Sequence, residues 1–208
     1  MPLSDLLEEW TLFTGSIGWQ EWLSFLCQLL SVWLAARNHV GVYPVGMVGV
    51  ILASYLYLYV ANPPLYADAM LNLYFFLMSL YGWILWVRKK NHTYRYPISY
   101  CSRTEWLSGL LWCASSWLLI YLTLRHYTDS NTPVMDAFVS STALTSMWWM
   151  ARRKIENWPA WILSNAVAIP LNYYKGFLLF SLMYVLFLLL AVYGWRSWIQ
   201  SYKTKSQL

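Results

Sequence analysis

Six side chains within apolar stretches of the sequence have the chemistry to hold a small flat molecule. These two tryptophans and four amides are Trp158, Trp161, Asn165, Gln28, Asn72 and Asn172. An indole face holds a flat aromatic cation by stacking and cation–π attraction, worth roughly 0.5 to 2 kcal/mol per contact. A carboxamide both donates and accepts hydrogen bonds, as a ribose hydroxyl or another amide requires. Together these groups predict a flat, aromatic and uncharged binding site.

Their spacing places several of them on one helical face. Trp158, Trp161 and Asn165 are separated by three and four residues, and Asn172 follows seven residues later, so all four share one stripe of a helix. Gln28 lies in the middle of another apolar stretch. Amides in membrane helices also bridge neighbouring helices, at roughly 0.6 kcal/mol each. A purely structural role for these side chains therefore stays open.

The residues of an enzyme, a pump or a metal centre are missing from the sequence. No apolar stretch carries a charged residue or a histidine at its middle, where a proton relay would need one. There is no GxxxxGK[ST] phosphate-binding loop. Cys27, Cys101 and Cys113 lack metal-ligand spacing, and we interpret them as small packing residues. We therefore expect no catalytic residue, no metal and no cofactor.

The segments that carry these side chains are long enough to cross a membrane. Of the 208 residues 59% are apolar and 11% are charged, whereas soluble domains carry about 25% charged residues. A bilayer core of about 30 Å needs roughly 20 apolar residues in a helix. We predict an all-α membrane protein with seven transmembrane helices, at residues 21–37, 40–60, 66–87, 105–125, 133–151, 157–173 and 176–198. The segments at 133–151 and 157–173 are the more polar ones.

The distribution of basic residues predicts the orientation of these helices. Cytoplasmic loops retain lysine and arginine. With the N-terminus outside and the C-terminus in the cytoplasm, only Arg125 and Lys175 of the 14 basic residues lie outside. We therefore expect a multi-pass protein of the cell inner membrane. The basic loops need no nucleic-acid partner to explain them.

Two parts of the chain resemble each other at nearly constant offsets. Residues 31–44 align without gaps on residues 146–159 with five identities, and YGWILW at 81–86 matches YGWRSW at 193–198. Such similarity predicts an internal repeat. We divide the chain into an N-terminal interfacial segment (1–19), a first three-helix unit (20–90), an inner loop and linker helix (91–131), and a second three-helix unit with a cytoplasmic tail (132–208). The linker helix makes the two units parallel.

The many tryptophans also have a general explanation. Aromatic belts are expected at both membrane surfaces. We assign Trp33, Trp86, Trp148, Trp195 and Trp198 to lipid-facing, interfacial or core positions, and Trp198 in particular to an interfacial anchor.

Two segments carry a resemblance to a known family. They are LYADAMLNLYFFLMSLYGWILW in the third predicted helix and KIENWPAWILSNAVAIPLNYYKGFLLFSLMYVLFLLLAVYGWRSW across the last two. Both resemble the Pnu family of bacterial vitamin transporters. The three-plus-one-plus-three plan is similar to that of the SWEET sugar transporters. The ENWxxWxxxN stretch, from Glu156 to Asn165, is the most specific part of the resemblance.

The resemblance implies a function. Pnu proteins import vitamin precursors by facilitated diffusion, and a cytoplasmic kinase traps the solute by phosphorylation. We expect a small cationic vitamin as substrate, nicotinamide riboside first and thiamine as the alternative within the family. Asn72 stands where nicotinamide riboside members have glutamine, and Met183 replaces a polar residue, so the solute stays open. A non-transporting membrane receptor or scaffold is the alternative of another class. Besides the bilayer and the kinase, a homo-oligomer is compatible with the sequence.

Overall fold

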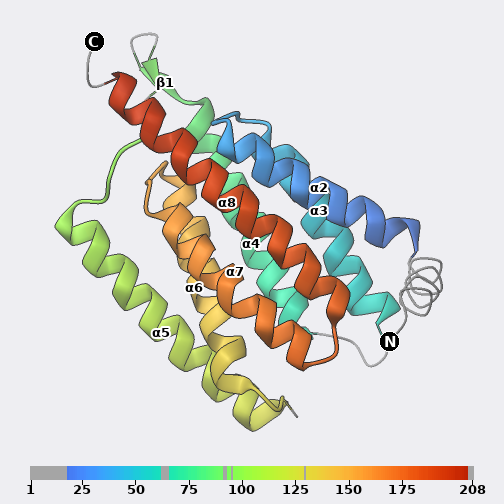
Figure 1. The fold of residues 1–208 in the computed structure, drawn as a ribbon. Helices are drawn as coiled ribbons and strands as arrows, with labels where there is room; N and C mark the ends of the chain where they lie inside the picture. The colour runs from blue at the N-terminus through green and yellow to red at the C-terminus, as the bar shows by residue number, and fades with distance from the viewer. Residues whose placement is uncertain (1–17, 62–65, 91–92, 95, 129, 206–208) are drawn as a thin grey trace, which may run out of the picture.

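Seven long helices form the described part of the protein, for which Figure 1 shows a computed structural model. The structure describes residues 18–61, 66–90, 93–94, 96–128 and 130–205. In chain order the helices are α2 (Trp19–Ala36), α3 (Val42–Tyr55) with its π-helical continuation η1 (Leu56–Val60), α4 (Tyr66–Val87), α5 (Arg103–Tyr127), α6 (Pro133–Ala151), α7 (Asn157–Tyr174) and α8 (Leu178–Lys205). Strands β1 (Lys89–Lys90) and β2 (Thr93–Tyr94) pair as a short antiparallel hairpin.

Each predicted segment is a helix, and the all-α fold with seven helices is confirmed. The bounds of α4 and α6 coincide with the predicted 66–87 and 133–151. Two details differ. Helix α8 continues seven residues past the predicted end at 198, because hydropathy marks where lipid ends and not where a helix ends. The π-helical turn η1 was not predicted, since one extra residue per turn leaves an apolar pattern unchanged. Most of the predicted interfacial segment 1–19 lies outside the described residues.

The more polar helices satisfy their polar groups internally. Helix α3 with η1, α4, α5 and α8 are long and apolar enough to cross a membrane by composition alone, whereas α2, α6 and α7 do not meet that criterion. In α6 the hydroxyls of Thr142, Thr145 and Ser146 donate to backbone carbonyls one turn earlier, at 2.7 to 2.9 Å. Bonding to the helix's own carbonyls removes the cost of an unpaired hydroxyl in an apolar environment.

The helices pack as two three-helix units with one helix outside them. Helix α3 contacts α2 and α4, and α7 contacts α6 and α8. The units meet where α2 packs against α8 and where α4 packs against α6. Helix α5 packs mainly along α6 and lies at the edge of the bundle (Figure 1). The interface between the units therefore contains α2, α4, α6 and α8.

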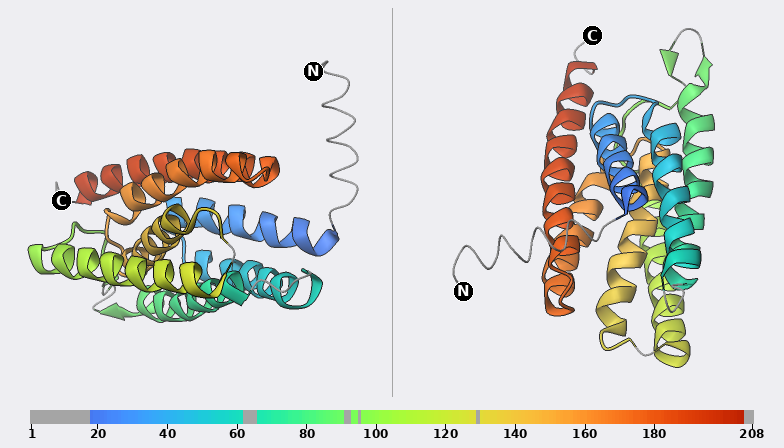
Figure 2. Two further views of the ribbon diagram at one scale, coloured as in Figure 1. Left: turned by 90° about the horizontal axis from the view of Figure 1, so that it is seen from below. Right: turned by 90° about the vertical axis from the view of Figure 1, so that its right-hand side faces the viewer.

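One end of the bundle gathers the basic loops. It holds the last turns of α2, α4 and α6, the hairpin and the α6–α7 loop, with Arg37, Arg88 and Arg152 to Lys154. The hairpin and the end of α8 lie at this same end (Figure 2, right). We call it the basic end. At the opposite end, Lys175 Nζ forms an ion pair with Asp136 Oδ1 at 2.5 Å.

Local contacts occur in pairs separated by the predicted repeat offset. Asn38 and Arg153 follow the last turns of α2 and α6 with positive φ angles of 54° and 55°. This left-handed conformation ends a helix and is uncommon for residues other than glycine. Ser24 Oγ donates to Gly49 O in the first unit, and Ser164 Oγ donates to Val139 O in the second, both at 2.9 Å. These pairs fit the internal repeat, which stays a prediction.

Candidate functional site

Helix α7 brings Trp161 against the first unit and carries Asn165 one turn further along. The ring of Trp161 is half-buried and lies 6.3 Å from the ring of Phe75 on α4, which belongs to the other unit. Asn165 follows one turn later and is 3% exposed. Within the described residues its carboxamide has no hydrogen-bond partner. The amide atoms of Asn165 are not among the fully buried atoms without a partner, so a ligand or water can bond them.

The other predicted amides bond locally within the described structure. Asn72 Nδ2 donates to Asp68 O at 2.9 Å, and Asn172 Nδ2 donates to Ala168 O at 2.8 Å, each within its own helix. Gln28 Nε2 donates to Ser24 Oγ at 3.2 Å. In each of these three amides the side-chain carbonyl oxygen accepts no hydrogen bond from the described residues. A binding role for the three stays a prediction.

Trp158 lies apart from Trp161, in an aromatic cluster at the basic end. It is 1% exposed, and its ring meets that of Trp198 edge-on at 5.5 Å. Trp198 contacts Trp86 at 6.0 Å, and Trp86 contacts Tyr43 edge-on at 5.1 Å. Tyr43, Trp86, Trp198 and Trp158 thus form a continuous row, which we call the aromatic row. It joins α3 and α4 of the first unit to α7 and α8 of the second.

The interfacial assignment of Trp198 is wrong, whereas Trp86 takes the core position among those expected for it. Trp86 and Trp198 are 1% and 0% exposed, and both indole N–H groups donate to backbone carbonyls. Trp33 and Trp195 are 37% and 38% exposed, as expected for lipid-facing positions. The reason for the error is that a tryptophan near a helix end looks interfacial in sequence whichever way the helix faces. A useful signal was present, because Trp86 and Trp198 each follow a glycine by one turn.

A strap, residues 96–102, runs beside the α6–α7 loop at the basic end. Ser99 pairs with this loop through two backbone hydrogen bonds, from Ser99 N to Arg153 O at 3.1 Å and from Ile155 N to Ser99 O at 3.0 Å. The Arg153 side chain is 1% exposed, donates to Tyr96 O at 3.0 Å and lies 4.2 Å from the Trp86 ring. Sequence reasoning placed Arg153 among solvated loop charges and missed this buried position.

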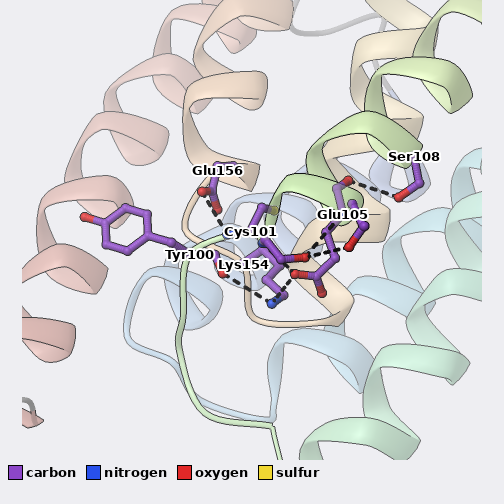
Figure 3. A network of polar contacts seen from close by, with 8 residues as sticks. Tyr100, Cys101, Glu105, Ser108, Lys154 and Glu156 are labelled. Carbon is purple, nitrogen blue, oxygen red and sulfur yellow. Dashed lines mark hydrogen bonds and ion pairs between the residues drawn. The ribbon is translucent and has the colours of Figure 1, made fainter.

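Polar side chains fasten the strap to the start of α5 and α7 (Figure 3). Glu156 Oε1 accepts a bond from Cys101 N at 2.9 Å, and Lys154 Nζ forms an ion pair with Glu105 Oε2 at 2.8 Å. Lys154 also donates to Tyr100 O at 3.3 Å. Burial, with a further contribution from the Glu156 carboxylate, raises the pKa of the Cys101 thiol to about 12. Cys101 therefore stays protonated at neutral pH, which agrees with a packing role.

Comparison with known proteins places the chain in a family. The model of the nicotinamide mononucleotide transporter family matches residues 18–200. The nicotinamide riboside transporter PnuC of Escherichia coli is 24% identical over 210 residues, covering 89% of this chain and 87% of that protein. The riboflavin/roseoflavin transporter RibM of Streptomyces davaonensis is 25% identical over 195 residues, covering 92% and 89%.

A solved structure shares the fold. The crystal structure of the vitamin B3 transporter PnuC aligns with a TM-score of 0.70 and 22% sequence identity, over 95% of this chain and 88% of that one. The family match, which extends over nearly all of the described helices, is a match to membrane transporters and not to enzymes. The chain belongs to the nicotinamide mononucleotide transporter family.

Proposed function

We propose that the chain carries nicotinamide riboside across the membrane by facilitated diffusion. The observation that supports this most is the ring of Trp161, which faces Phe75 of the other unit. One turn away lies the amide of Asn165, which is 3% exposed and has no hydrogen bond among the described residues. Trp161 and Phe75 offer rings that can stack on a pyridinium. The Asn165 amide can bond the carboxamide or a ribose hydroxyl of the solute.

The charge of the surroundings favours a solute without phosphate. Neither α4 nor α7 contains lysine, arginine or histidine, and a phosphate group in a membrane interior needs such a cation. Nicotinamide riboside meets this condition and the mononucleotide does not. Thiamine, a flat cation without phosphate, is the alternative within the family. Riboflavin, for which one relative is named, is an outcome that the binding test must distinguish.

The ionisable groups near the proposed binding site decide between proton-coupled transport and facilitated diffusion. The Asp136 carboxylate accepts bonds from Lys175, from Ser130 Oγ at 2.8 Å and from Thr132 Oγ1 at 3.2 Å, so it is held in a structural network. Asp68 begins α4 at the same end. With no such group beside Asn165 on α7, proton coupling has no relay. Net uptake in the cell is driven by a cytoplasmic kinase that phosphorylates the arriving solute.

Uptake into proteoliposomes tests this function. Purified protein is expected to equilibrate labelled nicotinamide riboside across the membrane without ATP and to the same level with or without a proton gradient. Unlabelled nicotinamide riboside, thiamine, riboflavin and nicotinamide mononucleotide are the competitors, and the mononucleotide should compete weakly. Accumulation above the outside concentration that a protonophore abolishes would contradict facilitated diffusion. Competition by riboflavin alone would reassign the solute.

We infer that the basic end faces the cytoplasm of a cell whose inner membrane holds the protein. Cytoplasmic loops retain lysine and arginine, and this end carries the α6–α7 loop with three consecutive basic residues. A fluorescent reporter fused after residue 208 should therefore fold and fluoresce, whereas a periplasmic phosphatase at the same place should be inactive. The reverse pattern would refute this orientation.

A further inference from the structure

We propose that Trp86 and Trp198 form a gate that closes the basic end of the path between the two units, and that this end opens when their two indole hydrogen bonds break. The gate deepens the proposed transport function, because a carrier must open each end in turn. Its geometry is independent of which solute is carried. The experiment below uses no solute.

The two tryptophans reach across the interface in opposite directions. Trp86 on α4 of the first unit donates from Nε1 to Ala151 O, the last residue of α6, at 3.1 Å. Trp198 on α8 of the second unit donates from Nε1 to Ala35 O on α2 at 2.9 Å. Both bonds are buried, and both link one unit to the other. Breaking the pair frees the ends of α4 and α8 from the facing unit.

Glycines allow these helix ends to pack closely. A Cβ atom on Gly82 would lie 2.4 Å from the ring of Tyr43, and one on Gly194 would lie 2.4 Å from the ring of Trp158. Real Cβ atoms do not approach so closely. The ring pairs Tyr43–Trp86 and Trp158–Trp198 have the same interplanar angle of 87°. The aromatic row thus consists of two similar ring pairs, one from each unit, and Trp86 and Trp198 are the residues through which the pairs contact each other.

Partnerless polar atoms favour opening of this end. Buried side-chain atoms without a hydrogen bond within the described structure include Asn38 Oδ1, Tyr43 Oη, Trp149 Nε1, Glu156 Oε2, Asn157 Oδ1 and Trp158 Nε1. These six lie in two segments, 38–43 and 149–158, at the basic end. An unpaired buried polar atom destabilises the closed arrangement, and water entering an open end would satisfy it. The bonds of Trp86 and Trp198 oppose that opening.

Accessibility of a buried thiol measures the opening. Ala36→Cys is introduced into a chain whose Cys27, Cys101 and Cys113 are replaced by serine, and the protein is placed in lipid nanodiscs, where both ends meet solution. Ala36 is 0% exposed and lies next to Ala35, the acceptor of the Trp198 bond. Labelling by a membrane-impermeant maleimide is expected to be slow with the gate intact. Trp198→Phe or Trp86→Phe keeps a ring and removes the donor, so each should accelerate labelling roughly two- to tenfold.

Two matched controls separate gate opening from general loosening. Trp195→Phe changes an exposed tryptophan on the same helix as Trp198 and should leave the labelling rate unchanged. Ala137→Cys, also 0% exposed but near the start of α6 at the opposite end, should label at the same rate with and without the Phe variants. Unchanged labelling at Ala36→Cys, or equal acceleration at both positions, overturns the gate.

A second measurement tests the gate even if the phenylalanine variants do not fold. In the chain that retains both tryptophans, Ala36→Cys should label faster than the protein unfolds globally, because local opening needs less free energy than unfolding. Labelling no faster than global unfolding overturns the gate. Failure of nicotinamide riboside to bind leaves both results unaffected, so the solute and the gate are tested separately.

Discussion

Replacing Trp161 with alanine is expected to weaken binding of nicotinamide riboside by a factor of roughly 5 to 150, or about 1 to 3 kcal/mol. The side chain is half-buried and faces Phe75 across the interface between the units, and alanine keeps the helix while removing the stacking surface. Trp161→Phe should lose less, because a smaller ring remains. Titration calorimetry on purified protein gives both affinities.

Substitution of the neighbouring Asn165 tests the same binding site. Asn165→Leu keeps the volume and removes the partnerless carboxamide, so it should weaken nicotinamide riboside more than an analogue that lacks the solute's amide. Trp195→Ala is the control, because that side chain is 38% exposed. Trp198 cannot serve as this control, since it is buried in the aromatic row. Native affinity in folded Trp161→Ala and Asn165→Leu would show that the stripe is helix packing.

The largest effect on stability is expected for Gly194→Ala. Alanine gains about 1 kcal/mol of helix propensity over glycine, but its Cβ would lie 2.4 to 2.6 Å from three indole atoms of Trp158, which is 1% exposed. Overpacking of a closed core typically costs about 1 to 3 kcal/mol, occasionally more. Because an indole held on both sides cannot move away, we expect the upper end of this cost, about 3 kcal/mol, and after the gain in helix propensity a net loss of about 2 kcal/mol. The apparent unfolding midpoint should fall by roughly 4 to 8 °C.

Gly46→Ala is the matched control for this substitution. A Cβ there would meet only the Ser31 side chain, with its hydroxyl at 2.8 Å, and a hydroxyl can rotate where an indole cannot. Gly82→Ala, which meets Tyr43, should behave like Gly194→Ala. A Gly194→Ala midpoint equal to or above that of the unaltered chain would mean that the aromatic row rearranges at little cost.

The helices could be predicted from sequence because lipid selects for length and hydropathy. The predicted segment 66–87 and helix α4 have the same bounds, and the polar segment 133–151 is a helix despite its serines and threonines. Bonds of these hydroxyls to their own helix explain why hydropathy underestimates α6. Charge asymmetry predicted which loops share an end, but not how the strap lies beside the α6–α7 loop.

Which neighbouring helix each residue of a helical face contacts could not be predicted from length and hydropathy. Trp158 and Trp161 are three residues apart and share a stripe in sequence, yet Trp158 packs against Trp198 whereas Trp161 faces Phe75. The difference comes from α8, which crosses α7 where Gly194 leaves room. A single helical pattern carries no information about where a neighbouring helix crosses it. Information about pairs of residues is needed, such as the glycine one turn before Trp86 and before Trp198.

The bond from Trp198 to Ala35 can form only late in biosynthesis. The two residues are 163 positions apart, and ribosomes add about 5 to 20 residues per second. The first unit therefore waits roughly 8 to 33 s after Ala35 is made before its partner residue exists. During that interval the face of α2 that α8 will cover is exposed to lipid, to the insertion machinery or to other nascent chains. Slow synthesis through α5 would lengthen this vulnerable period.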